Sequence, residues 1–334
     1  MDRLYPLTMS PFLRTQVWGG DHLAAYGKAV KAGDKVGESW EVSGHRDGLS
    51  RVASGPLAGK TLPELVAEFG ADLVGTGVPT DRPFPLLIKL IDAAEQLSVQ
   101  VHPSDEYCAA HRLADPGKPE AWYILEAAPG ARIWKGLLPG TTPEKFEALL
   151  AAGRLQECLR SFPAAAGDCI DLPAGVIHAI GAGILMAEVQ QTSDLTYRVF
   201  DWNRLGLDGK PRQLHVREAL ETIDFASLGG SDFGDKVSPR TGPLPGGGRR
   251  LSLVANDKFE MEVLELSGAH EIPGDASRFT CVLVIDGSAR FGSAVDSQAA
   301  SRGTSLLLPA SLGSIRAVPE RNCRLLVARP SGRR

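Results

Sequence analysis

The stretch of residues 86–105, LLIKLIDAAEQLSVQVHPSD, constrains the fold of this chain more than any other. It opens with an apolar run of strand length and ends in SVQVH (98–102), where polar and β-branched residues alternate strictly. Alternation is the period of a β-strand, so Ser98, Gln100 and His102 share one face of it. Polar groups that enter a protein core need partners. We therefore expect this face to line a pocket in which Gln100 and His102 hold a metal ion.

The composition is that of an ordinary globular protein. With 334 residues the chain is long enough for two domains, each with its own core. Charged residues (23%) and hydrophobic residues (43%) are near globular averages. The net charge of −4 is spread without a basic block, so we expect no nucleic-acid partner. No apolar run approaches the roughly 20 residues that span a bilayer, and residues 1–16 lack the apolar segment of a signal peptide, so we expect no membrane partner.

The five cysteines are odd in number and none is in a CxxC pair. This usage is typical of free thiols in a reducing compartment, and it argues against disulfides or a thiolate zinc site. We therefore expect a cytoplasmic protein.

Short apolar runs separated by glycine-rich turns predict a mainly β fold with few helices. A capping box, Thr-Leu-Pro-Glu, opens a predicted helix at 61–74, and Thr-Pro-Glu opens a second helical segment at 142–160, expected to form a helical hairpin on the sheet. Residues 238–250, rich in proline and glycine, are the best linker candidate. The sequence thus predicts a first domain at 1–237 and a smaller β domain at 251–334.

A weak internal repeat relates the two halves. The segment GDCIDLPAG (167–175) resembles GTSLLLPAS (303–311), and each follows a turn segment that contains Pro-Gly or Asp-Gly. Two such copies predict two β-sandwich or barrel halves of jelly-roll type. The second copy has Ser314 where the first has His178. We therefore expect that the second half holds no metal.

Four residues form the candidate metal site: Gln100, His102, Glu120 and His178. Two imidazoles, a carboxylate and an amide oxygen suit a borderline divalent cation such as Zn²⁺ and leave room for substrate or water. Taken singly, histidines on strands are more often core or surface residues. The remaining histidines are in polar or turn-like surroundings and are expected to be exposed: His22, His45, His111, His215 and His270. No Walker loop, GxGxxG, GxSxG or HExxH motif supports nucleotide binding, serine hydrolysis or zincin chemistry.

Four motifs in order carry a resemblance to a known family: QVHP (100–103), KPEAWY (118–123), PAG with His178, and EVQQTSDLTYR (188–198). Their order and spacing resemble type I mannose-6-phosphate isomerase in its short bacterial form, over roughly residues 5–205. The resemblance implies a cupin fold, that is, a double-stranded β-helix or jelly-roll catalytic domain, followed by a second, smaller cupin-like domain. It also implies one zinc ion per chain, held by the four candidate ligands.

The implied reaction of mannose metabolism is the reversible interconversion of mannose 6-phosphate and fructose 6-phosphate. It needs a proton moved between C1 and C2 through an enediol-like intermediate, and Zn²⁺ polarises the carbonyl without redox chemistry. Arg198 is expected to stabilise the enediolate, because it is permanently charged and can hold two oxygens. Glu188 and Asp194 lie on the same segment, and Glu188 is a plausible base, although the sequence does not fix which residue acts.

The phosphate end of the substrate needs fixed donors. Ser98 offers a hydroxyl on the face of Gln100, and Lys118 and Arg204 offer positive charge. Without the resemblance, Lys118 and Arg204 would be interpreted as solvated surface residues. Ile180 departs from the longer family members, which tend to carry an aromatic hydroxyl there.

Two other functions compete with the isomerase. One is a different metal-dependent cupin enzyme, a sugar isomerase or a dioxygenase; non-haem iron oxygenases use two histidines and a carboxylate, so the added glutamine argues against them. The other is a non-catalytic cupin that binds a sugar. The sequence leaves open whether the chain is a monomer or a homodimer, and we expect the second domain to serve packing and pocket closure.

Overall fold

The computed structural model describes residues 3–226, 234–292 and 297–332, and many more of them lie in β-strands than in helices. The strands of the first two thirds are β1 (Leu7–Ser10), β2 (Phe12–Gly20), β3 (Val36–Val42), β4 (Gly44–His45), β5 (Gly48–Leu49), β6 (Arg51–Val52), β7 (Leu86–Ala93), β8 (Val99–Val101), β9 (Glu120–Ala127), β10 (Arg132–Leu137), β11 (Leu159–Pro163), β12 (Cys169–Leu172), β13 (His178–Ile180), β14 (Ile184–Gln191) and β15 (Tyr197–Phe200). The strands of the last third are β16 (Arg240–Pro243), β17 (Gly248–Ala255), β18 (Phe259–Leu266), β19 (His270–Ile272), β20 (Thr280–Asp286), β21 (Ser288–Gly292), β22 (Ser297–Ser301), β23 (Ser305–Leu308), β24 (Ile315–Pro319) and β25 (Cys323–Pro330).

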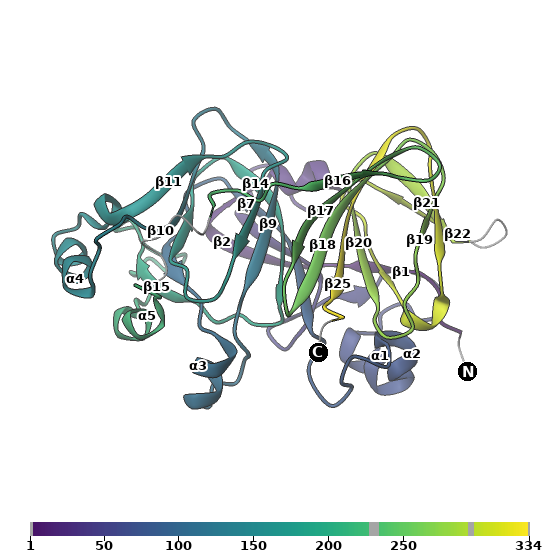
Figure 1. Cartoon of the computed structure of the whole chain (residues 1–334), viewed down its shortest axis with the longest axis horizontal. Coiled ribbons are helices and arrows are strands. Elements are labelled where there is room, and N and C mark those ends of the chain that lie inside the picture. The colour runs from purple at the N-terminus through teal and green to yellow at the C-terminus, as the bar shows by residue number, and fades with distance from the viewer. Residues whose placement is uncertain (1–2, 227–233, 293–296, 333–334) are drawn as a thin grey trace.

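The helices are short and lie at the edges of the molecule (Figure 1). They are α1 (Leu62–Phe69), α2 (Ala71–Val74), α3 (Asp105–Ala110), α4 (Pro143–Ala151) and α5 (Val216–Thr222), with 3₁₀ turns η1 (His22–Tyr26), η2 (Leu155–Cys158) and η3 (Ala310–Leu312). Within the described ranges, none of them is long and apolar enough to cross a membrane.

The first β-lobe consists of two antiparallel sheets. One has six strands in the order β12-β9-β14-β7-β3-β2, and the other has five in the order β11-β10-β13-β8-β15. Apolar side chains from both sheets form one core, among them Trp122 and Met186 from the first sheet and Ile133 and Ile180 from the second. The sheets therefore pack face to face, and polar residues on their inner faces can meet.

The second lobe repeats this design. It combines an eight-stranded sheet, β16-β17-β18-β25-β20-β23-β1-β6, with a four-stranded sheet, β19-β24-β21-β22. Val282, Phe291 and Leu306 lie in the core between them. Two antiparallel lobes of this kind, with few helices, form a cupin-type fold, as the sequence predicted.

The two lobes are joined by more than the chain that links them. Strand β1 pairs with β23, with Leu7 opposite Leu307, so the N-terminal strand belongs to the sheet of the second lobe. Figure 1 accordingly draws the N-terminal end beside that lobe. One hydrophobic cluster contains Leu86 from the first lobe and Phe259 from the second. The division into domains at 1–237 and 251–334 stays a prediction, and β1 crosses it.

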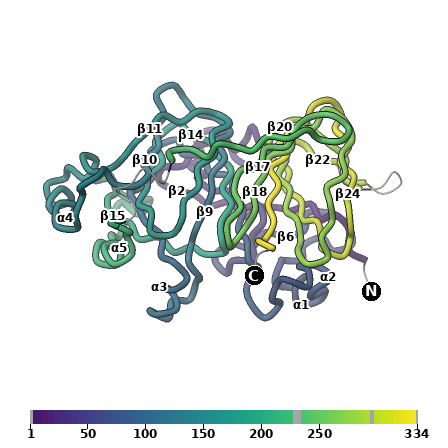
Figure 2. Tube along the Cα trace, viewed as in Figure 1, coloured from purple at the N-terminus to yellow at the C-terminus, as the bar shows by residue number. Residues whose placement is uncertain are grey.

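The stretch 238–250 is not the irregular linker that its composition suggested. It contains β16 and the first residues of β17, which pair as an antiparallel hairpin with Arg240 opposite Ser252. Three successive glycines at 246–248 have φ values of 87°, 100° and 102°, a region that favours glycine. The prolines and glycines thus form a turn, and Figure 2 shows the green trace passing through it into the second lobe.

The helix predictions hold at their N-termini. Glu64 closes the capping box by accepting a hydrogen bond of 2.8 Å from the backbone N–H of Thr61, and Thr142 caps α4. The second arm of the predicted hairpin differs, because Gly153 adopts a φ of 67° and ends the helical turn. It forms only the 3₁₀ turn η2, and Leu159 already begins β11.

Candidate active site

A row of three polar residues crosses the inner face of the five-stranded sheet. Strand β8 lies between β13 and β15, and its Gln100 is opposite His178 on one side and Arg198 on the other. Val99 and Val101, on the opposite face of β8, are fully buried. The alternation read from the sequence is therefore confirmed, and it places a candidate metal ligand next to the arginine predicted to act on the substrate.

His102, Glu120 and His178 form a cluster in which one ligand atom from each lies within 4.8 Å of the others. The Nε2 atom of His178 is 3.4 Å from Oε1 of Glu120, and Nε2 of His102 is 3.5 Å from Oε2. The side-chain amide of Gln100 adjoins the cluster, with its nitrogen 3.3 Å from Nε2 of His178. Amide oxygen and nitrogen exchange places on a flip, so Gln100 can also present its oxygen here.

Both imidazoles are oriented by backbone carbonyls. Nδ1 of His102 donates to the carbonyl of Leu195 at 2.8 Å, and Nδ1 of His178 donates to that of Val176 at 2.9 Å. The other ring nitrogen, Nε2, faces Glu120 in both residues and can offer its lone pair to a metal, the arrangement typical of metal-binding histidines. Burial, reinforced by Lys118, lowers the pKa of His102 to about 4, and burial also lowers the pKa of His178. Both rings are therefore neutral at neutral pH, as a metal requires.

Glu120 supplies a negative charge at the same point. Burial alone would raise its pKa, but Lys118 and His102 lower the pKa of Glu120 well below its usual range. Lys118 Nζ is 3.2 Å from one carboxylate oxygen. Among the described residues, neither oxygen receives a hydrogen bond of good geometry. A buried, ionised carboxylate facing two neutral imidazoles is a donor set for a divalent cation, so these residues fit a bound metal ion.

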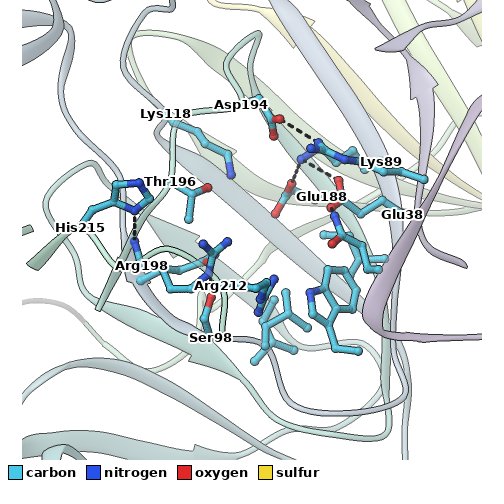
Figure 3. A pocket seen from close by; sticks show the side chains of 17 residues that line it. Glu38, Lys89, Ser98, Lys118, Glu188, Asp194, Thr196, Arg198, Arg212 and His215 are labelled. Carbon is cyan, nitrogen blue, oxygen red and sulfur yellow. Dashed lines mark hydrogen bonds and ion pairs between the residues drawn. The ribbon is translucent and has the colours of Figure 1, made fainter. Parts of the chain in front are cut away.

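A cavity of about 300 Å³ opens beside this cluster, between the inner faces of the two sheets. Figure 3 shows the side chains that line it. Gln100, Lys118 and Ile180 line the cavity close to the metal cluster. This volume falls at the lower end of the range of small-molecule sites, so the cavity suits a compact ligand.

Glu188 lies in a buried ionic cluster on the six-stranded sheet. It is directly opposite Lys89 on β7, and its Oε1 is 3.1 Å from the Lys89 ammonium. Its other oxygen accepts a 2.9 Å hydrogen bond from the indole of Trp122. Burial alone would lower the pKa of Lys89, but Glu188 and Glu38 raise it. Lys89 therefore stays charged and fixes the carboxylate of Glu188 at the cavity wall.

Asp194 also lines the cavity, and it is held by two contacts. Its carboxylate accepts a 2.8 Å hydrogen bond from Arg14, and its backbone N–H donates to Asp115. Burial would raise the pKa of Asp194, but Lys89 and Arg14 lower it. Asp194 is thus ionised and paired with Arg14.

Arg198 points into the cavity with part of its guanidinium unpaired. Nη1 donates to the carbonyl of Gln213 at 2.9 Å, whereas the buried Nε has no hydrogen-bond partner among the described residues. Burial, followed by the nearby charge of Arg212, lowers the pKa of Arg198. A buried cation next to another cation is a site for an anionic ligand.

The three residues predicted for the phosphate are in different places. Ser98 lines the cavity, but its hydroxyl donates to Gln100 at 3.2 Å. Lys118 lines it too, and its ammonium is 3.3 Å from Nε2 of His102, at the metal end. Arg204 is not among the lining residues: it donates to Asp201 and to the carbonyl of Gln96. The structure does not bring Arg204 to the cavity.

Several residues of the site were not predicted from the sequence. Lys89 lies inside an apolar strand, where a lysine signals a buried ion pair.

The prediction that five histidines are exposed was wrong in part. His45 and His270 are buried, at 3% and 6% exposure, and His215 lines the cavity. His45 pairs with a buried aspartate, Asp115, at 3.0 Å, which explains how it is accommodated.

The fold and the site together define a metal-dependent enzyme of the cupin class. A sequence relative, the probable mannose-6-phosphate isomerase GmuF of Bacillus subtilis (strain 168), is 34% identical over 98% of this chain and 99% of its own length. The chain belongs to the family of type I mannose-6-phosphate isomerases, which are aldose–ketose isomerases. The family's sequence model, phosphomannose isomerase type I, catalytic domain, matches residues 7–121.

Other comparisons agree. Mannose-6-phosphate isomerase ManA of Bacillus subtilis is 40% identical over 67% of this chain and 69% of its own length. The crystal structure of the mannose 6-phosphate isomerase from Bacillus subtilis superposes with a TM-score of 0.88 at 31% identity, over 97% of this chain and 99% of that one. A putative mannosephosphate isomerase from Archaeoglobus fulgidus, 21% identical with a TM-score of 0.77 over 98% and 99% of the two chains, shows the same fold.

Proposed function

We propose that this chain interconverts mannose 6-phosphate and fructose 6-phosphate, with one zinc ion held by Gln100, His102, Glu120 and His178. The observation that carries the proposal is the row His178–Gln100–Arg198, of which Gln100 and Arg198 line a cavity of about 300 Å³ together with Glu188. The candidate metal ligand Gln100, a cation for a developing oxyanion and a candidate base thus line the same small space.

Zinc bound at this cluster would supply Lewis acidity toward the carbonyl and hydroxyl oxygens at C1 and C2 of the sugar. Glu188 Oε1 is the atom we assign to proton transfer between the two carbons. Lys89, whose ammonium is 3.1 Å from this oxygen, and Trp122, which donates to the other oxygen, hold the carboxylate in position. Asp194, whose carboxylate is paired with Arg14, is the alternative base.

Arg198 is assigned to the enediolate. It pairs with the metal ligand Gln100 across the sheet and lines the same cavity, and a fixed cation stabilises charge that develops on the substrate oxygens. Ser98 and Lys118 also line this space and are proposed to hold hydroxyl or phosphate oxygens of the substrate. Ile180 leaves an apolar patch on the wall. A cytoplasmic location and a monomeric or homodimeric state stay predictions.

The proposal is tested by a coupled assay that detects fructose 6-phosphate formed from mannose 6-phosphate, run with and without oxygen. We expect equal turnover in both. Turnover that requires oxygen would point to a dioxygenase and contradict the isomerase.

A second arm separates an enzyme from a sugar-binding protein. Arg198→Ala should keep the metal content and the fold but lose at least about 100-fold in kcat, the size typical of removing one oxyanion-stabilising group. Arg217→Ala is the matched control, because Arg217 is on the surface of α5 with its side chain 84% exposed. Normal turnover by Arg198→Ala would overturn the assigned role.

A further inference from the structure

We propose that Arg212 binds the phosphate group of the substrate and that Asp201 is the positioning residue that holds Arg212 in place. The inference rests on the proposed function, because it names the subsite for the phosphate of the same sugar phosphate. It gives Arg212 the role that the sequence had suggested for Arg204.

Arg212 follows β15 in the chain. Its side chain lines the cavity, as that of Arg198 does. Its Nε donates to one oxygen of Asp201 at 2.7 Å and its Nη2 donates to the other at 2.5 Å. This two-point contact uses one edge of the guanidinium and leaves Nη1 for a ligand. Figure 3 draws Arg212 beside Arg198, with Ser98 below them and Lys118 and Asp194 at the opposite end. Arg198 is thus beside Arg212 and also pairs with the metal ligand Gln100, so a phosphate held by Arg212 would leave C1 and C2 to extend toward Arg198 and the metal cluster.

Asp201 is held rigidly, so it can fix the direction of Arg212. Its side chain is only 6% exposed and also accepts hydrogen bonds from Arg204. The next two residues, Trp202 and Asn203, have φ values of 58° and 55°, a left-handed conformation that non-glycine residues adopt only when contacts impose it. The indole of Trp202 donates to the carbonyl of Leu97 at 2.6 Å and anchors this turn to the end of β8.

The charges at this end favour an anion. Arg198, Arg204 and Arg212 surround a single buried carboxylate, that of Asp201. The exposed Glu95 is 4.0 Å from Arg204 and neutralises little of the remaining charge. A phosphate monoester carries nearly two negative charges at pH 7 and prefers the planar fork of arginine. Arg198 and Arg212, the two of these arginines that line the cavity, therefore match the phosphate end of the substrate.

The test compares wild type, Arg212→Gln, Arg212→Lys, Asp201→Asn and the surface control Arg217→Gln. KM and kcat are measured with mannose 6-phosphate, and inorganic phosphate is the probe for direct binding by calorimetry. Arg212→Gln should raise both KM and the phosphate Kd by roughly 10- to 100-fold, with less than about threefold change in kcat and unchanged metal content.

The conservative variants separate positioning from folding. Arg212→Lys keeps the charge but loses the fork, so we expect a KM between those of wild type and Arg212→Gln. Asp201→Asn should raise KM roughly three- to tenfold at similar kcat, because the guanidinium loses its charged partner. Arg217→Gln should behave as wild type.

Two results would overturn the proposal: an Arg212→Gln variant that binds phosphate as wild type does, or an Asp201→Asn variant that loses kcat and metal together at unchanged KM. Failure of the proposed function looks different. In that case wild type would bind phosphate through Arg212 yet fail to isomerise mannose 6-phosphate.

Discussion

Glu41 lies at the contact between the two lobes, where its carboxylate is completely buried. One oxygen accepts hydrogen bonds from the Lys28 ammonium at 2.7 Å and the Ser305 hydroxyl at 2.6 Å, and the other accepts from Ser39 at 2.6 Å. Lys28 also donates to the carbonyl of Gly303 at 2.6 Å. This buried ion pair therefore ties β3, which carries the cavity residue Glu38, to the second lobe.

The perturbation is Glu41→Gln, which keeps the shape but removes the charge. The substitution leaves the Lys28 ammonium buried without a counter-ion. It also puts an amide NH₂ where the carboxylate accepts hydrogen bonds: the Lys28 ammonium can only donate, and the hydroxyls of Ser39 and Ser305 would have to reorient. Breaking a buried pair in this way costs about 3–5 kcal/mol. With an unfolding entropy of about 2.1 cal/mol/K per residue, the 334 residues give roughly 0.7 kcal/mol per degree, so Tm should fall by roughly 4–7 °C.

Calorimetry or thermal circular dichroism measures this shift. Glu157→Gln is the matched control, because Glu157 forms an exposed ion pair with Arg154 and its own side chain is 52% accessible. This substitution should move Tm by less than about 1 °C. A Glu41→Gln protein that melts within 1 °C of wild type would refute the reasoning that this pair joins the lobes.

Three further predictions concern the site and its surroundings. His102→Ala should lose bound metal and activity together, as measured by elemental analysis and the coupled assay; retained metal at full occupancy would remove His102 from the ligand set. Glu188→Gln should lower kcat by about 10²–10⁴-fold with little change in metal content, which steady-state kinetics decides. Asp92 raises the pKa of His22 through a hydrogen bond and its charge. The stabilisation from that pair is full below about pH 6.5 and lost as pH rises through the higher folded pKa. Because His22 is largely exposed, His22→Gln should cost less than about 1 kcal/mol at pH 5.5 and nothing measurable at pH 9, by denaturant titration.

Local sequence patterns predicted the parts of this protein that local chemistry controls. The strict alternation around Gln100 predicted a strand with a polar face, and the capping residues Thr61 and Thr142 predicted where helices begin. In each case, the interaction that produces the structure joins residues only a few positions apart, so a short stretch of sequence contains all the residues that determine it.

Long-range pairing was not predictable in the same way. Strand β1 joins the second lobe by pairing with β23, about 300 residues later in the chain, and the sequence of its four residues does not indicate that partner. Lys89 looked like an interruption of an apolar strand until its cross-strand neighbour Glu188 was in place. Arg212 and Arg204 both bind Asp201, and only the direction of the loop decides which of them reaches the cavity.

The account depends most directly on the metal that the cluster is proposed to hold. Metal-stripped protein, titrated with Zn²⁺ while bound metal and turnover of mannose 6-phosphate are measured in the same sample, tests this dependence. We predict no turnover without metal and a linear rise that saturates at one zinc per chain. Full turnover in the metal-free protein would contradict the central claim.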